Sequence, residues 1–349
     1  MLHFSPHTFE FPEPVSDFER QVIDFCQKWQ AGKSEFEFFT SGSTGTPKSI
    51  LISREAMIAS AELTGNWLKL VPNDVALLSL PVQYIAGAMV LVRAFVLKLQ
   101  LVVVDPSRNP LKNLRPVSIH LASFVPNQWH GIIEDKVQLP AYFSDAKGVL
   151  LGGAGLSPWL ISQTTPFKFP VYLTYGMTET VSHVAFQEIC PELSTNFQLL
   201  PSVEFELAKD KCARFKAAMT ANQWIKTNDL VERIDSKHFK LLGRLDRVIN
   251  SAGRKIHAEQ VEIEVGKLVS DCNFFIAGLP DDALGQKAVL FLEGSEPPIN
   301  LDEIRHKLAA KLRSWEIPKE VICLAKFETT VSGKLDRLKS VDLYLNAQK

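Results

Sequence analysis

Residues 38–50 read FFTSGSTGTPKSI, so a polar loop rich in hydroxyl side chains stands between two apolar flanks. A β-hairpin turn takes about two to five residues, whereas this polar run takes nine and ends in a lysine. Glycines in such a loop let backbone N–H groups point inward, hydroxyls add donors, and the lysine adds positive charge. The pattern predicts a loop that binds a triphosphate, and a plain turn is the weaker alternative. The residues that we expect to take part are Thr40, Ser41, Gly42, Ser43, Thr44, Gly45 and Lys48.

The strict Walker phosphate-loop pattern is not met, because Pro47 precedes Lys48. A Walker loop enters a helix, whereas residues 49–53 after this loop read as a strand. Residues 35–39 before it also read as a strand. We therefore expect a phosphate loop that connects the two strands of a β-hairpin.

The length and composition of the chain limit which classes of protein it can belong to. A chain of 349 residues exceeds what one hydrophobic core usually organises, so two domains are expected. The 38 basic and 39 acidic residues balance, which argues against the basic face of a nucleic-acid-binding protein. The five cysteines form no CxxC pair, the N-terminus shows no signal-peptide pattern, and no apolar run is long enough to span a membrane. We expect a cytoplasmic protein with no nucleic-acid partner and no membrane insertion.

Apolar runs of strand length alternate with segments of helical periodicity in the first half of the chain. Strands are predicted at 35–39, 49–53, 74–80, 99–105, 119–124, 148–151 and 171–175, and helices at 54–70, 86–98, 127–134 and 157–165. This alternation predicts an α/β fold with a mainly parallel sheet and covering helices. From about residue 204 short strands with polar turns predict a small antiparallel unit. We predict a large domain over 1–243, a hinge over 244–247 and a small, mobile α+β domain over 248–349.

The segment YGMTET, residues 175–180, ends the last predicted strand of the first half. An aromatic ring, a glycine, a hydroxyl and a carboxylate in succession offer a stacking face, a bare backbone, a phosphate contact and a ligand for a hard cation. Tyr175, Gly176, Thr178 and Glu179 are therefore candidate site residues. The alternative is an ordinary turn in which Thr178 or Thr180 is a cap.

Two further segments are weaker signals of the same site. Gly153 and Ala154 follow a predicted strand, at the position where open α/β folds bind ligands against bare backbone. Asp229, in the segment WIKTNDL, offers a carboxylate that can accept both hydroxyls of a ribose. A tight strand-to-helix turn and a solvated turn aspartate are the respective alternatives.

Three segments near the predicted hinge and beyond it complete the set. They are GRLD at 243–246, GRK at 253–255 and TVSGKLDR at 330–337. They contribute Arg244, Asp246, Gly253 and Lys334 as candidates. A lysine in a glycine-flanked terminal loop is otherwise typical of solvated surface.

Together these motifs resemble those of the acyl-adenylate-forming (AMP-binding) superfamily, and the resemblance covers about residues 38–340. That superfamily includes acyl-CoA and aryl-CoA synthetases, luciferases and peptide-synthetase adenylation domains. The resemblance implies that Tyr175 lines the adenine site, that Asp229 binds the ribose and that Arg244 contacts the nucleotide. It also implies that Thr178 contacts phosphate and that Glu179 holds Mg²⁺.

The resemblance also implies a reaction. ATP activates a small-molecule carboxylic acid as an acyl-AMP, and coenzyme A then takes the acyl group as a thioester, with Mg²⁺ as the metal. Lys334 is then the catalytic lysine that bridges the acid and the α-phosphate, and Lys48 supplies charge to the triphosphate. The C-terminal domain is expected to swing about Asp246, which brings the Gly253 loop to coenzyme A.

The segment LPVQYIAG at 80–87, with Arg93 after it, is most similar to short o-succinylbenzoate-CoA ligases of menaquinone biosynthesis. Those enzymes usually carry histidine where Tyr84 stands. Arg93 is either the partner of the second carboxylate of a diacid or a structural arginine, and the sequence leaves both open. The remaining alternatives are another aryl- or acyl-CoA ligase, an adenylation module that loads a carrier protein, and a degenerate nucleotide-binding protein. A degenerate protein would be expected to lose Glu179 or Lys334.

One departure from the superfamily is large, because only 39 residues precede Thr40. A much longer segment usually stands there, so most of one N-terminal subdomain is expected to be absent. Apolar surface left without that cover is rarely exposed on a monomer. We therefore expect a homodimer.

Overall fold

The computed structural model describes residues 2–8, 10–40, 48–269, 272–297, 300–329 and 335–347. Two sets of predicted site residues lie outside these ranges, namely loop residues 41–45 and Lys334. The backbone of Thr40 and Lys48 is described, and their side chains are not.

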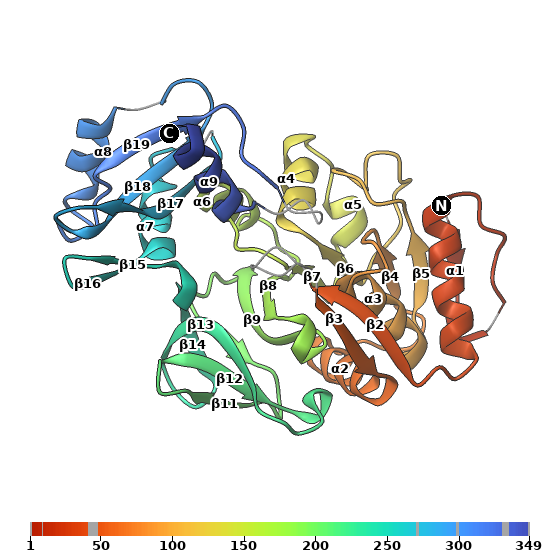
Figure 1. The fold of residues 1–349 in the computed structure, drawn as a ribbon. Helices are drawn as coiled ribbons and strands as arrows, with labels where there is room; N and C mark the ends of the chain where they lie inside the picture. The colour runs from red at the N-terminus through yellow and green to blue at the C-terminus, as the bar shows by residue number, and fades with distance from the viewer. Residues whose placement is uncertain are drawn as a thin grey trace.

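The first half of the chain forms a parallel sheet with helices on both faces (Figure 1). Its strands are short, mostly buried apolar runs, which suits a sheet covered on both sides. Ala76 and Leu78 pack in one hydrophobic core, while Leu77 between them packs in another on the opposite face of the sheet. In spatial order the strands are β5 (Gln100–Val103), β4 (Val75–Leu78), β6 (Leu121–Phe124), β7 (Gly148–Leu151) and β8 (Val171–Gly176). The helices are α1 (Asp17–Gln30), α2 (Arg54–Leu68) and α3 (Ile85–Val96) on one face, with α4 (Pro126–Glu134), α5 (Pro140–Phe143) and α6 (Pro158–Thr164) on the other.

The antiparallel unit predicted from about residue 204 is present, and it continues the same sheet. Strand β9 (His183–Cys190) pairs antiparallel with β8 and leads into five further antiparallel strands, while β1 (Leu2–Phe4) pairs antiparallel with β5 at the other edge. After β9 the order is β10 (Phe197–Leu199), β14 (His238–Arg244), β13 (Ile225–Arg233), β12 (Cys212–Lys216) and β11 (Glu204–Leu207). Among the described residues, the 310 turns are η1 (Pro6–Thr8), η2 (Thr178–Thr180), η3 (Ala218–Thr220) and η4 (Leu245–Arg247). The described residues of the large domain thus share one sheet of twelve strands and a separate hairpin.

The predicted hairpin is confirmed. Strands β2 (Glu35–Thr40) and β3 (Lys48–Ser53) pair antiparallel as a separate two-stranded sheet, with Thr40 opposite Lys48 at the loop end. Ser53 ends β3 and caps α2, because its Oγ accepts a hydrogen bond from the Ala56 N–H (3.2 Å). One face of the hairpin packs on the core, whereas Phe39 and Leu51 on the other face are 51% and 63% exposed.

The C-terminal residues form a second, five-stranded sheet with its own helices, at the upper left of Figure 1. Its strands are β15 (Val248–Ser251), β16 (Arg254–His257), β17 (Phe274–Asp281), β18 (Gly285–Glu293) and β19 (Glu320–Leu324), and its helices are α7 (Ala258–Val265), α8 (Leu301–Leu308) and α9 (Arg337–Ala347). The turn η4 lies between the two sheets, and Gln260 of α7 donates a hydrogen bond to the Leu242 carbonyl of β14 (2.9 Å). The predicted hinge at 244–247 therefore coincides with the passage between sheets, and its movement stays a prediction. Within the described ranges, none of the helices combines the length and apolar character needed to cross a membrane.

Candidate functional site

Two of the predicted segments meet at one edge of the parallel sheet. Strands β7 and β8 are parallel neighbours, so the residues after them lie at the same edge, where α/β folds bind ligands. Gly153, after β7, has a φ of 88°, a left-handed conformation that favours glycine. Gly153 and Ala154 are both exposed, as a backbone surface for a ligand requires.

Tyr175, at the end of β8, joins the site through its hydroxyl group. The hydroxyl donates a hydrogen bond to Asp229 Oδ2 (2.6 Å). Burial raises the pKa of Tyr175 well above its ordinary value, and the charge of Asp229 adds to this effect, so the phenol remains a donor. The ring contacts three phenylalanines and is 8% exposed, so its predicted role as an adenine-stacking face stays a prediction.

Asp229 is in turn linked to Arg244 and Asp246. Arg244 Nη1 lies 3.6 Å from Asp229 Oδ1, and its Nε and Nη2 donate to the two oxygens of Asp246 (3.0 and 2.8 Å). These hydrogen bonds lower the pKa of Asp246 and raise that of Arg244. Tyr175, Asp229, Arg244 and Asp246 thus form a continuous polar chain from β8 to η4. The structure brings together four residues that the sequence placed in one site.

Gly176 is required by the close approach of β9. It pairs with His183, and a Cβ atom at this position would lie 2.1 Å from the Ser182 carbonyl oxygen. The turn between the two strands is held by Thr180, whose hydroxyl accepts from the Met177 N–H (3.0 Å). Thr180 is therefore the structural threonine of the YGMTET segment.

Thr178 and Glu179 are left available by this arrangement. Both are partly exposed, and neither side chain makes a hydrogen bond or ion pair with another residue that the structure describes. Within those same residues, no group of three His, Cys, Asp or Glu side chains could hold a metal. Mg²⁺ at nucleotide sites is usually bound by one or two carboxylates together with phosphate oxygens and water, so a single glutamate fits that metal.

We expect Glu179→Gln to raise the Mg²⁺ concentration needed for half-maximal activity, with little change in melting temperature. Glutamine keeps the shape of the side chain and removes the charge that a hard cation requires. Activity is measured across a Mg²⁺ titration, and the melting temperature by calorimetry. A large loss of stability with an unchanged Mg²⁺ requirement would instead assign Glu179 a structural role.

Arg93 lies in the core beside the same turn. It is 2% exposed, its Nη2 donates to Ser182 Oγ (2.9 Å), and its Nε has no hydrogen-bond partner among the residues that the structure describes. Those residues also include no carboxylate in an ion pair with it. Burial lowers the pKa of the guanidinium to about 9, so it still carries its charge at neutral pH. A buried cation without a carboxylate is costly unless a ligand supplies one.

His183 and Thr64 extend this contact, and sequence reasoning missed both of them, as well as Ser182. His183 Nδ1 lies 3.2 Å from Ser182 Oγ, and its Nε2 lies 2.8 Å from Thr64 Oγ1. Burial lowers the pKa of His183 well below its ordinary value, and the charge of Arg93 lowers it further, so the imidazole is neutral. We call Arg93, Ser182, His183 and Thr64 the buried arginine cluster.

Tyr84, the other predicted substrate residue, is not joined to this cluster. It is the residue before α3, partly buried, and nine residues before Arg93. Its backbone is extended (φ −105°, ψ 149°), so helical geometry does not place its side chain relative to Arg93. The contact of Tyr84 with the acid stays a prediction.

Of the C-terminal candidates, Gly253 belongs to neither group, and Lys334 lies outside the described residues. Gly253 is exposed at the tip of the β15–β16 hairpin, with a φ of 76°. Arg337 begins α9 and donates to both oxygens of Glu262 in α7 (2.5 and 2.9 Å). This ion pair fixes the start of α9, three residues after the predicted catalytic Lys334 in the sequence.

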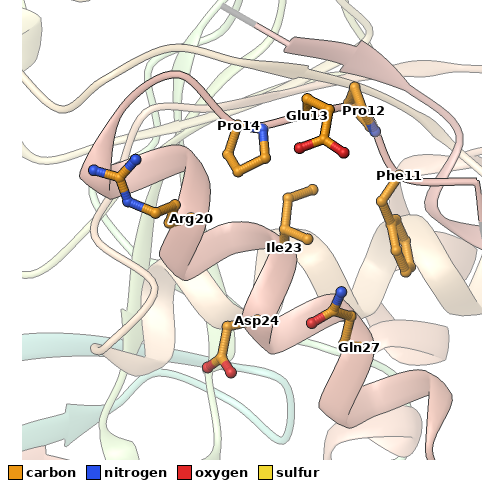
Figure 2. Close-up of a pocket in the computed structure, with 8 residues that line it drawn as sticks. All are labelled: Phe11, Pro12, Glu13, Pro14, Arg20, Ile23, Asp24 and Gln27. Carbon is orange, nitrogen blue, oxygen red and sulfur yellow. The ribbon is translucent and has the colours of Figure 1, made fainter.

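Two hollows elsewhere on the surface do not coincide with these residues. One of about 300 Å³ lies between α1 and the loop before it, and Figure 2 shows Phe11, Glu13 and Pro14 of that loop facing Arg20 and Ile23 of the helix. Its lining includes no residue of the polar chain or the buried arginine cluster. A hollow of about 330 Å³ beside Trp67, Tyr172 and Glu188 also contains none of them.

Comparison with known proteins gives one matching family. The sequence model of the AMP-binding enzyme family matches residues 27–214. A solved structure of an acyl-CoA synthetase (AMP-forming)/AMP-acid ligase II-like protein from Dyadobacter fermentans is 35% identical, covers 98% of this chain and 99% of that one, and superposes with a TM-score of 0.66.

Two similar proteins carry a more specific name. The 2-succinylbenzoate–CoA ligase of Listeria monocytogenes is 23% identical over 345 residues, which cover 93% of this chain and 73% of that protein. The o-succinylbenzoate coenzyme A synthetase of Bacillus subtilis, solved in complex with ATP and magnesium ion, is 22% identical. The superposition of the two structures covers 88% of this chain and 69% of the Bacillus protein, with a TM-score of 0.76. The two proteins therefore share the fold.

Proposed function

Because the chain belongs to the AMP-binding enzyme family, we propose that it is an acid–thiol ligase that converts o-succinylbenzoate, ATP and coenzyme A into o-succinylbenzoyl-CoA. The observation that carries the choice of a diacid is Arg93, a buried guanidinium whose Nε lacks a partner within the described residues. The named relatives from Listeria and Bacillus support the same acid. The aliphatic carboxylate reacts, and the aromatic carboxylate stays unreacted beside Arg93.

The reaction has two steps. In the first, an oxygen of the aliphatic carboxylate attacks the α-phosphorus of ATP, and pyrophosphate leaves with the broken phosphoanhydride bond. In the second, the sulfur of coenzyme A attacks the activated carbonyl carbon, its proton is lost, and AMP leaves. The first step is needed because a free carboxylate is a poor electrophile. It brings two anions together, so cationic side chains at the site lower its barrier.

The residues divide between these tasks as follows. Asp229, held by Tyr175 and Arg244, binds the ribose, and Thr178 contacts phosphate. Glu179 would hold Mg²⁺, which when bound offsets phosphate charge. Lys48 and residues 40–45 bind the triphosphate, Gly153 and Ala154 give the base or acyl group a backbone surface, and Lys334 bridges the acid and the α-phosphate.

A change of domain orientation separates the two steps. We propose that the C-terminal domain turns about Asp246 after adenylate formation, which withdraws Lys334 and brings the Gly253 hairpin to coenzyme A. Arg244 donates two hydrogen bonds to Asp246 in η4 and also lies beside Asp229, the proposed ribose ligand. One residue, Arg244, therefore contacts both the hinge and the ribose site. Such hinge motions commonly move a few residues at an element boundary.

A panel of acids tests the proposal through acid-dependent pyrophosphate release, with and without coenzyme A. We expect o-succinylbenzoate to be the preferred acid, and thioester to form with free coenzyme A. Preference for a fatty acid or a simple benzoate would make the protein another acyl- or aryl-CoA ligase. Adenylate formation that ignores coenzyme A would favour a module that loads a carrier protein. The substrates ATP and coenzyme A also lead us to propose a cytoplasmic location.

We further propose a homodimer. The exposed Phe39 and Leu51 lie on one face of the β2–β3 hairpin, opposite Ser49 and Glu37 respectively, and two exposed apolar side chains on one face favour burial by a partner. Light scattering at micromolar concentration is expected to give twice the chain mass of 39.0 kDa. A measured mass equal to one chain, 39.0 kDa, would exclude the dimer.

A further inference from the structure

The buried arginine cluster forms one chain of hydrogen bonds with a defined direction. Arg93 Nη2 contacts Ser182 Oγ (2.9 Å), Ser182 Oγ contacts His183 Nδ1 (3.2 Å), and His183 Nε2 contacts Thr64 Oγ1 (2.8 Å). Thr64 Oγ1 also lies 3.0 Å from the Ser60 carbonyl oxygen, one helical turn earlier in α2. Three segments of the chain, at residues 60–64, 93 and 182–183, thus meet in the core.

The two ends of this chain fix where its hydrogens lie. A guanidinium can only donate, so Ser182 accepts from Arg93 and keeps its own hydrogen for His183 Nδ1. A carbonyl oxygen can only accept, so the Thr64 hydroxyl donates to Ser60 and accepts from His183 Nε2. Only a neutral imidazole with its proton on Nε2 makes all four contacts. The other neutral form would leave the Ser60 contact unmade and the Ser182 hydrogen unplaced.

The backbone and the packing hold the imidazole in this orientation. Val181 has a φ of 65° and a ψ of −43°, and the Ser182 N–H donates to the Thr180 carbonyl (2.7 Å), which together make a tight γ-turn. A positive φ is strained for a β-branched residue, so the surrounding contacts must hold this turn. The ring of His183 packs against Phe186, with centroids 4.5 Å apart.

We propose that His183 is a positioning residue that sets the preference for a diacid. His183 Nδ1 accepts the hydrogen of the Ser182 hydroxyl, which directs the lone pairs of Ser182 toward Arg93. This contact fixes the orientation of the guanidinium and leaves its Nε to donate to the second carboxylate. The inference rests on the proposed function for the identity of the acid. The hydrogen-bond direction on which it depends is a property of the free protein.

Two substitutions of His183 separate its two nitrogens. Asparagine places an amide oxygen near the position of Nδ1, so His183→Asn keeps the acceptor for Ser182. Glutamine places its amide near Nε2, so His183→Gln keeps the donor for Thr64 and loses that acceptor. We expect His183→Gln to raise the KM for o-succinylbenzoate about tenfold, the scale of one hydrogen bond to a charged group. The KM for ATP and kcat are expected to stay near wild type, and His183→Asn to restore the KM within about twofold.

Two controls distinguish positioning from a general packing defect. The same variants are assayed with the analogue that lacks the ring carboxylate, for which the KM of His183→Gln should equal that of wild type because Arg93 has no anion to bind. In a Ser182→Ala background, His183→Gln should add nothing further, because the contact through which it acts is gone. Equal KM values for the Asn and Gln variants, or equal losses with the diacid and the analogue, would overturn the proposal.

A spectroscopic measurement tests the inference without any substrate. ¹⁵N NMR of histidine-labelled protein, with His183→Asn used for assignment, should show His183 neutral with its proton on Nε2. A proton on Nδ1, or on both nitrogens, at neutral pH would overturn the inference. If wild type fails to activate the diacid while this signature is present, the proposed acid is wrong and the hydrogen-bond direction stands.

Discussion

Replacing Lys334 by alanine is expected to slow adenylate formation by about a hundredfold to a thousandfold, the scale of one lost electrostatic contact to a transition state. Lys334 is assigned as the cation between the carboxylate of the acid and the α-phosphate, where negative charge accumulates as the two anions approach. Pyrophosphate exchange measures this first step. When preformed acyl-adenylate is supplied, thioester formation should proceed at nearly the wild-type rate, because the second step uses the other domain orientation.

Lys339→Ala is the matched control for that variant. Lys339 is an exposed lysine of the same terminal segment, 3.9 Å from Asp336, and a surface pair of this kind contributes little. Its substitution should leave both steps unchanged. Equal losses of Lys334→Ala in the two steps would mean that the lysine acts in both orientations or supports the fold, and the assignment would then be wrong.

The anchoring of the segment after Lys334 gives this prediction a second test. The partly buried Glu262 accepts hydrogen bonds from two nitrogens of Arg337 and from the Ile276 N–H (2.8 Å), so the start of α9 is fixed to the C-terminal core. Removing one partner of this pair leaves the other partly desolvated and without its hydrogen bonds, which destabilises the fold. Arg337 variants should therefore lower the melting temperature as well as the rate, whereas Lys334→Ala should lower the rate alone. This difference separates a residue that supports the loop from one that acts in it.

Local sequence patterns predicted much of the fold. The strands β4 to β8 and the helices α3, α4 and α6 follow from buried apolar runs and helical periodicity, and the hairpin around the predicted phosphate loop follows from the length and polarity of residues 40–48. The continuity of the twelve-stranded sheet did not follow, because β9 and β10 carry the chain from the parallel to the antiparallel part through pairings that no local pattern specifies. Strands β1 and β9 and helices α1, α5 and α9 were likewise absent from the prediction.

Local sequence patterns likewise predicted only part of the candidate site. Tyr175, Asp229 and Arg244 were predicted because each stands in a motif, and the structure joins them by direct contacts. Ser182 and His183 were missed although they follow the YGMTET motif closely, because their significance comes from Arg93 and Thr64, which are distant in the sequence. A lone histidine in an apolar strand looks like an ordinary core residue until its partners are known.

Arg93→Met is expected to raise the KM for o-succinylbenzoate by about a hundredfold while the KM for ATP stays nearly unchanged. A charge-assisted hydrogen bond contributes about 1.5–3 kcal/mol, and each 1.4 kcal/mol is about tenfold in affinity. Methionine fills much of the arginine's volume without its charge, so the loss reports recognition of the second carboxylate and not a cavity. Arg108→Ala, at an exposed arginine paired with Glu134, is the control and should leave both KM values unchanged.

The stability of Arg93→Met separates the two roles that the sequence left open for this residue. A structural arginine contributes to the free energy of unfolding, so its removal would lower the melting temperature. A buried guanidinium with no carboxylate partner among the described residues instead costs desolvation energy, since only Ser182 contacts it by a hydrogen bond there. We therefore expect the melting temperature of the free protein to stay level or rise, and the extra stability that wild type gains from the diacid to disappear in the variant. A fall of several degrees together with a normal KM for the diacid would make Arg93 a structural residue, and the acid would then have to be sought among monocarboxylic substrates.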